Sequence, residues 1–98
     1  MPNAQSRAER LDAALRAAFH PVLLRVADDS ARHAGHAGAA PGGQTHFSVL
    51  LVSAAFRGQA RVARARAVHD ALGAEFAAGM HALALTLRTP EEQERAGG

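Results

Sequence analysis

No cysteine, lysine, tryptophan or tyrosine occurs among the 98 residues of this sequence. Because cysteine is absent, the chain can form neither a disulfide nor a zinc ribbon, and it cannot hold an iron–sulfur cluster by its own thiolates. Any metal must be bound through histidine, carboxylate or the ligands of a partner. The aromatic residues are four phenylalanines, so the core must rest on a few Leu, Val and Phe side chains.

Long apolar runs are absent as well. No stretch approaches the roughly 20 apolar residues that a membrane helix needs. The early charges of Arg7, Glu9 and Arg10 do not suit the apolar centre of a secretion signal. We therefore expect a cytoplasmic protein with no membrane partner.

Acidic and basic residues nearly balance, and the formal net charge is +2. The pI of about 11.0 is high because all the basic residues are arginine, which effectively never deprotonates. So small a net charge gives only weak support to non-specific nucleic-acid binding. The length indicates one domain over residues 1–98, and we expect residues 1–5 and 94–98 to fray.

Helices are predicted from capping boxes and apolar periodicity. A capping box at residues 6–9 begins a helix that should end near His20, since a proline follows. A second box at 89–92 begins a short terminal helix. Between them we expect a helical turn over 53–58 and one long helix over 60–78, an arrangement similar to a helix-turn-helix.

Strands are predicted at residues 22–28, 47–53 and 81–88, where β-branched and other apolar residues cluster between turn residues. The second segment is apolar on both faces, which is typical of a central strand. The expected order is α-β-β-α-α-β-α. We expect an antiparallel first pair, a parallel second pair and helices on one face, hence an α+β fold with a three-stranded mixed sheet.

The segment between the first two predicted strands carries His33, His36 and His46, three of the six histidines. The segment is rich in Gly and Ala, and loops of this length in a small domain tend to be functional or disordered. Clustered imidazoles beside a strand suggest a metal site. The same residues also fit a solvated loop with incidental histidines, and the sequence alone leaves both interpretations open.

Short motifs in a fixed order along residues 8–93 resemble the BolA family. They are VADDS at 26–30, HAGHAG at 33–38, GQTHF at 43–47, LVS at 51–53 with Phe56 and Gly58, RAR at 64–66, GMHAL at 79–83 and TPEE at 89–92. The chain departs from the usual family pattern at Gln44, Ala65 and His69. The resemblance implies a fold similar to class II KH domains, although no Gly-x-x-Gly nucleic-acid loop stands in the expected context.

BolA-like proteins are associated with transcriptional regulation in the stress response. They also partner monothiol glutaredoxins and share a [2Fe–2S] cluster with them in iron handling. The resemblance therefore implies such a partner, with a glutaredoxin cysteine and a glutathione thiolate as further cluster ligands. A chain without cysteine suits a shared cluster, since histidine can replace cysteine at one iron.

Within this resemblance His81 is the implied cluster ligand, through the motif Gly-x-His-Ala-Leu. Its spacing alone favours a half-buried histidine at a strand start, satisfied by a backbone carbonyl. A residue of the histidine loop is the implied second ligand, and we prefer His36 to His33. His46 either orients the loop or acts as an alternative ligand.

Four arginines are candidate phosphate contacts: Arg57, Arg61, Arg64 and Arg66. Arg64 and Arg66 should lie about 200° apart on a helix, so no single basic stripe forms. The residues also fit solvated charges that flank a core face. If the chain binds double-stranded DNA, we expect the turn at Arg57 and Arg61 to make the contact, with phosphate contacts dominating over base readout.

No nucleophile stands in a recognisable catalytic context, so we do not expect an enzyme. We expect an adaptor that partners a monothiol glutaredoxin and supplies histidine to a shared [2Fe–2S] cluster. The alternatives are a DNA-binding transcriptional regulator that uses the helix-turn-helix-like segment, and a simple zinc site in the histidine loop. A monomer or a weak homodimer is expected.

Overall fold

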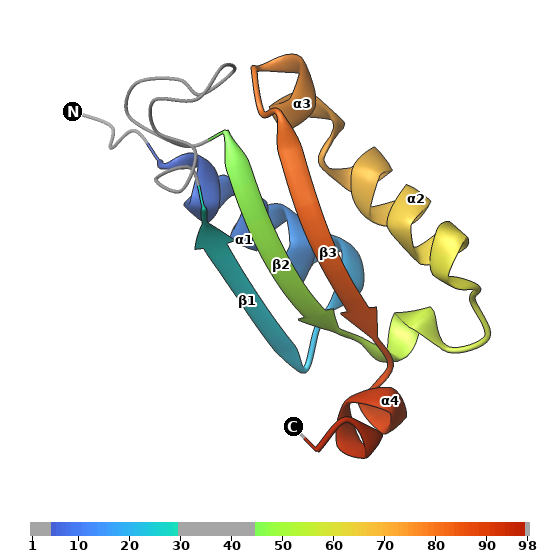
Figure 1. Cartoon of the computed structure of the whole chain (residues 1–98). Coiled ribbons are helices and arrows are strands. Elements are labelled where there is room, and N and C mark those ends of the chain that lie inside the picture. Colours follow the sequence, from blue (N-terminus) through green and yellow to red (C-terminus); the bar gives the residue numbers. More distant parts are fainter. Residues whose placement is uncertain (1–4, 30–44, 98) are drawn as a thin grey trace.

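A three-stranded sheet in the order β1-β2-β3 forms the centre of the computed structural model, which describes residues 5–29 and 45–97 (Figure 1). β1 pairs antiparallel with β2, and β2 pairs parallel with β3. The predicted α+β fold, its mixed sheet and its central second strand are confirmed. The described elements are α1 (Arg7–Phe19), β1 (Leu23–Asp28), β2 (His46–Val52), the 3-10 helix η2 (Ala54–Phe56), α2 (Arg61–Ala71), α3 (Gly73–Ala77), β3 (Ala82–Arg88) and α4 (Pro90–Arg95).

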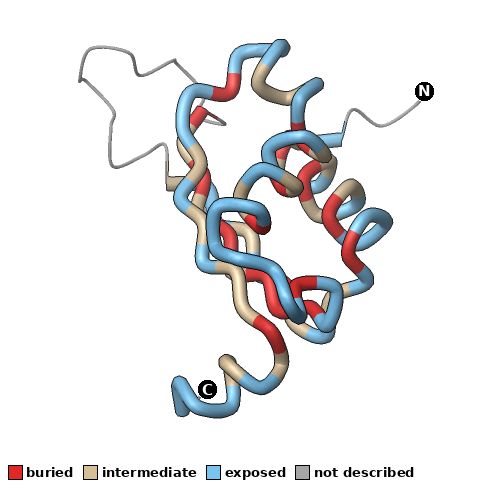
Figure 2. Tube along the Cα trace, turned by 90° about the vertical axis from the view of Figure 1, so that its right-hand side faces the viewer, coloured by how far each residue is buried: buried red, intermediate tan, exposed pale blue. Residues whose placement is uncertain are grey.

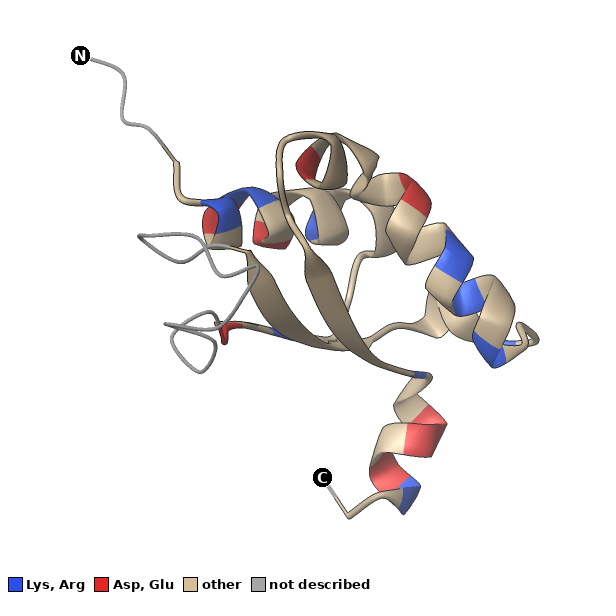
Figure 3. Cartoon of the chain, turned by 45° about the horizontal axis from the view of Figure 1, so that its top comes forward, with Lys and Arg blue, Asp and Glu red and all other residues tan. Residues whose placement is uncertain are grey.

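Helices α1 and α2 lie on one face of the sheet, while α4 lies beyond the end of β3 (Figures 1 and 3). Figure 2 shows the buried residues gathered between the sheet and these helices. Burial of each large apolar side chain contributes about 1.5–3 kcal/mol. The fully buried apolar side chains are Leu11 and Leu15 of α1, Phe47, Leu51 and Val52 of β2, Phe56, Val68 and Leu72.

Both predicted capping boxes are present. At α1, Ser6 Oγ accepts from Glu9 N at 3.1 Å, and Glu9 Oε1 accepts from Ser6 N at 2.8 Å. Thr89 and Glu92 make the same exchange at α4, at 3.1 and 2.8 Å. α1 ends before His20, which adopts a left-handed conformation with φ 46°. α4 runs from Pro90 to Arg95, so its last two residues overlap the segment in which fraying is expected.

Four strand boundaries differ by one residue from the expectation. β2 begins at His46 and β3 begins at Ala82. β1 begins at Leu23, and Val22 before it is 71% exposed. β2 ends before Ser53, because the Ser53 hydroxyl accepts a hydrogen bond from Ala55 N at 3.0 Å and caps η2. Hydroxyl side chains favour such caps over strand interiors.

The long helix predicted over 60–78 is wrong in one respect, because it is divided into α2 and α3. The break lies at Leu72, whose φ of −108° and ψ of 15° are not helical. Leu72 is 1% exposed, and the next residue is Gly73. Glycine weakens a helix interior, so the helix is easily interrupted beside Gly73. The buried Leu72 side chain fits the core with a non-helical backbone at this point. None of the described helices is long and apolar enough to cross a membrane.

Candidate functional site

The N-terminal end of the parallel strand pair brings His46 and His81 together. Their ring centroids are 5.8 Å apart, and the ring planes meet at 81°. Residue His46 is the register partner of Ala82, the first residue of β3. The backbone carbonyl of Thr45 accepts from His81 N at 2.8 Å and from Ala82 N at 3.1 Å. Backbone pairing therefore holds two histidines that are far apart in the sequence side by side.

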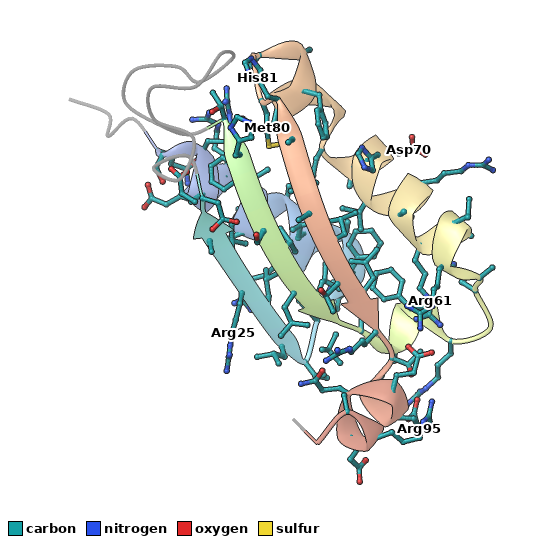
Figure 4. All side chains as sticks on the ribbon, in the orientation of Figure 1. Arg25, Arg61, Asp70, Met80, His81 and Arg95 are labelled. Atoms are coloured by element: carbon teal, nitrogen blue, oxygen red, sulfur yellow. The ribbon has the colours of Figure 1, made fainter. Side chains whose placement is uncertain are left out.

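The turn before β3 presents His81 to solvent. Gly79 has φ 112°, a conformation that L side chains rarely adopt. Met80 then turns inward and is 3% exposed, and its N–H donates to the carbonyl of Glu75 at 3.0 Å. Because Met80 is anchored in the core, His81 comes out exposed at the start of β3 (Figure 4).

An ion-pair clamp between α1 and α3 supports this turn. Arg7 Nε and Arg10 Nε each donate to the Glu75 carboxylate at 2.8 Å. Arg7 Nη2 also donates to the carbonyl of Ala78 at 2.9 Å. The hydrogen bond from Arg10, helped by that from Arg7, lowers the pKa of Glu75 below its usual value. The clamp fixes the backbone immediately ahead of the histidine turn.

Hydrogen bonds hold His46 to Thr45 and to Asp29, the residue that follows β1. Its Nδ1 lies 2.9 Å from Oγ1 of the buried Thr45. Its carbonyl accepts from Asp29 N at 2.7 Å, and Ser48 Oγ donates to the Asp29 carboxylate. The two described ends of segment 30–44 therefore lie beside this histidine. The predicted ligands His33 and His36 lie in that segment, outside the described residues.

The described donors alone do not make a complete metal site. Over residues 5–29 and 45–97, no three His, Asp or Glu side chains gather closely enough to hold a metal ion. His46 and His81 offer two imidazoles, which suit Zn, Cu and Fe. A four-coordinate centre at this place would need further ligands from residues 30–44 or from a partner.

Arg57 and Arg64 bind the terminal helix. Arg57 donates to both oxygens of Glu91, at 3.0 and 2.6 Å. Arg64, which is 7% exposed, donates to both oxygens of Glu92 at 2.6 and 3.1 Å. Its hydrogen bond and that of the Thr89 N–H lower the pKa of Glu92 to about 2. The alternative interpretation of Arg64 as a solvated flanking charge is therefore wrong, and its role as a phosphate contact stays a prediction.

The other two candidate arginines, Arg61 and Arg66, are exposed on α2. Arg61 lies at the first residue of the helix, facing the space between α2 and α4 (Figure 4). The element before α2 is the three-residue η2, shorter than the first helix of a helix-turn-helix. Arg61 and Arg66 form no ion pair with another described residue, whereas Arg57 is exposed but paired with Glu91.

Sequence reasoning missed Thr45 and Glu75. The Thr45 carbonyl accepts from His81 and Ala82, and the sequence gives no signal for such a backbone role. Glu75 meets Arg7 and Arg10 across 68 and 65 positions of sequence. The only available signal was a charged residue in the middle of the otherwise apolar stretch 71–80, which marks a side chain in need of a partner.

A sequence model of the BolA-like protein family matches residues 15–92 of the chain. The chain belongs to the BolA family. A relative from a Sinorhizobium species, an uncharacterised protein in the cobS 5′ region, is 44% identical over 91 residues, which are 92% of this chain and 98% of the relative. The DNA-binding transcriptional regulator BolA of Escherichia coli is 43% identical over 86 residues, or 88% of this chain and 78% of that protein.

Solved BolA structures have the same fold. The BolA domain of SufE1 from Arabidopsis thaliana superposes with a TM-score of 0.81 at 40% identity, covering 92% of this chain and 99% of that domain. The resemblance to the BolA family that the motifs predicted is thus confirmed, together with the fold that it implied.

Proposed function

We propose that this BolA-family chain is a regulatory adaptor that binds a monothiol glutaredoxin and supplies histidine ligands to a [2Fe–2S] cluster shared between the two proteins. The observation that carries the proposal is the placement of His81 beside His46 at an exposed end of the sheet. On a chain without cysteine, His81 and one further histidine form half of such a site. A partner's thiolates complete it.

The residues of this chain have distinct parts in the proposed site. His81 is the principal ligand, since its exposed imidazole can meet a partner without any change in the sheet. The second ligand comes from the segment whose described ends adjoin His46; we assign it to His36 in preference to His33. His46, with Nδ1 next to the Thr45 hydroxyl, orients the site or serves as the alternative ligand. A cluster held in this way supplies one-electron redox chemistry, at a potential raised by histidine ligation.

A spectroscopic titration tests the adaptor function. The chain is added to a monothiol glutaredoxin that carries a glutathione-ligated [2Fe–2S] cluster, and visible absorption and circular dichroism are recorded. We expect spectra that differ from the sum of the components and saturate at equimolar chain. His81→Ala should abolish the change, while His69→Ala, at an exposed histidine on α2, should retain it. Purely additive spectra for the unaltered chain would refute the adaptor function.

Duplex DNA binding is the second candidate function. It is favoured by the name of the Escherichia coli relative, a DNA-binding transcriptional regulator, and by the exposure of Arg61 and Arg66 on α2. Binding of this kind should weaken with salt, because phosphate contacts release counterions. Electrophoretic mobility of a duplex at low salt, with the unaltered chain and with Arg61→Gln, tests this function. An unshifted duplex at low salt would remove it.

A further inference from the structure

An open groove of about 470 Å³ lies at the opposite end of β3 from the histidine pair, between α2 and α4. Three arginines from three different elements line it: Arg61 of α2, Arg88 of β3 and Arg95 of α4. Figure 4 shows the labelled Arg61 and Arg95 on either side of this space. The volume is in the range of sites for small molecules.

Glu92 also lines the groove and its charge acts on Arg95, but the ion pairs of the nearby carboxylates are made with other arginines. Glu91 and Glu92 are engaged by Arg57 and Arg64, with N···O distances of 2.6 Å in both pairs. Arg88 Nη1 donates to the neutral Gln93 side chain at 2.7 Å, so its charge stays uncompensated. Arg61 and Arg95 are exposed and form no ion pair with another described residue.

A smaller hollow of about 220 Å³ adjoins the groove and shares Arg61, Leu85 and Leu87 with it. Ala65 completes its lining beside the buried Arg64. The hollow therefore offers apolar surface next to the three charges. A ligand with a doubly charged head and a flat, weakly polar body matches this combination, because arginine forks bind phosphate and also stack on planar rings.

We propose that this groove binds a nucleoside phosphate, with the phosphate between Arg61, Arg88 and Arg95 and the base over Leu85, Leu87 and Ala65. A free nucleotide and the end of a nucleic-acid strand present the same chemistry. The site does not depend on the glutaredoxin function. Ala82 and Arg88, at the two ends of β3, are about 20 Å apart, given a strand rise of about 3.3 Å per residue.

The test is a titration of the ¹⁵N-labelled full chain, followed by NMR at low salt, with ADP, inorganic pyrophosphate and a short single-stranded oligonucleotide as separate probes. We expect saturable shifts at Arg61, Arg88 and Arg95 with ADP, and tighter binding of ADP than of pyrophosphate. Arg61→Gln and Arg95→Gln should each weaken binding about tenfold, the effect of losing one charge-assisted hydrogen bond. Both positions are exposed, so neither change should disturb the fold.

Arg66→Gln is the matched control, since Arg66 is an exposed arginine of the same helix that does not line the groove. It should leave the ADP affinity within about twofold, as should His81→Ala. If only the oligonucleotide binds saturably, and the binding depends on Arg61 and Arg95, the site is supported. Its ligand is then the end of a nucleic-acid strand and not a free nucleotide. Pyrophosphate that binds as tightly as ADP would overturn the base position. An absence of saturable binding by all probes, or an equal loss in Arg66→Gln, would overturn the site.

Discussion

The imidazoles of His46 and His81 meet edge to face, with 5.8 Å between their ring centroids. The contact is set by the backbone, because the Thr45 carbonyl receives the N–H groups of both His81 and Ala82. A site built on paired strands is held more precisely than one built on loops. The described half of the proposed cluster site is thus organised before any partner arrives.

Removal of the negative charge from Glu75 should loosen the histidine turn. Glu75→Gln removes the negative charge from both ion pairs and leaves a single side-chain oxygen to accept from Arg7 and Arg10, and we expect a loss of about 1–2 kcal/mol of unfolding free energy. NMR should also show shifts at residues 79–81. Glu94→Gln, at an exposed position of α4, is the control. Unchanged signals at residues 79–81 would count against a positioning role for Glu75.

Arg64 should matter more for stability than any other arginine of α2. Besides Glu92, its guanidinium donates to the carbonyls of Gln59 at 2.9 Å and Leu87 at 3.2 Å. Arg64→Ala leaves those partly buried acceptors without a partner, and we expect a loss of about 2–4 kcal/mol in urea unfolding. Arg66→Ala should cost less than about 0.5 kcal/mol. Comparable losses in the two variants would contradict the burial of Arg64.

Stability should fall in acid through Glu92. Its pKa in the folded chain is about 2, against 4.5 for the ordinary carboxyl. The stabilisation is therefore complete above the higher value and is lost as the pH falls from about 4.5 to about 2. Glu75 contributes in the same direction. Urea midpoints measured across this range should fall more steeply for the unaltered chain than for Glu92→Gln, and parallel curves would contradict the assignment.

Gly79 should tolerate no side chain without strain. The backbone φ of Gly79 is 112°, and this conformation is the source of the strain. Crowding does not contribute, because an added Cβ would meet no atom within 4 Å. Gly79→Ala should destabilise the chain by about 1–2 kcal/mol. Gly73→Ala is a matched control in α3, also without close neighbours, and should stabilise by about 0.5–1 kcal/mol. A neutral Gly79→Ala, measured by thermal unfolding, would refute the strain.

Local signals in the sequence predicted most of the fold. The capping boxes at Ser6 and Thr89 act over a few residues, so they can be recognised without knowledge of the tertiary structure. The break at Leu72 could not, because it depends on how that side chain packs in the core. The burial of Arg64 likewise depends on α4, which meets α2 only in the folded chain.

The residues of the candidate site were proposed from the sequence, and their roles stay predictions. The motif around residue 81 pointed to His81 and the loop pattern pointed to His46, and the structure brings these two histidines together. Their contact required the parallel register, which no single segment encodes. The clamp at Glu75 required knowledge of which helices touch. The roles of His33 and His36 stay predictions, since both lie outside the described residues.

Histidine ligation of the shared cluster is tested most directly by electron paramagnetic resonance. The chain is prepared with ¹⁵N-labelled histidine, combined with an unlabelled monothiol glutaredoxin that carries the [2Fe–2S] cluster, and reduced by one electron. We predict a strong ¹⁵N hyperfine coupling from each ligating histidine. His81→Ala should remove the contribution of His81, and His69→Ala should leave the couplings unchanged. A reduced cluster without coupling to histidine nitrogen of this chain would contradict the account.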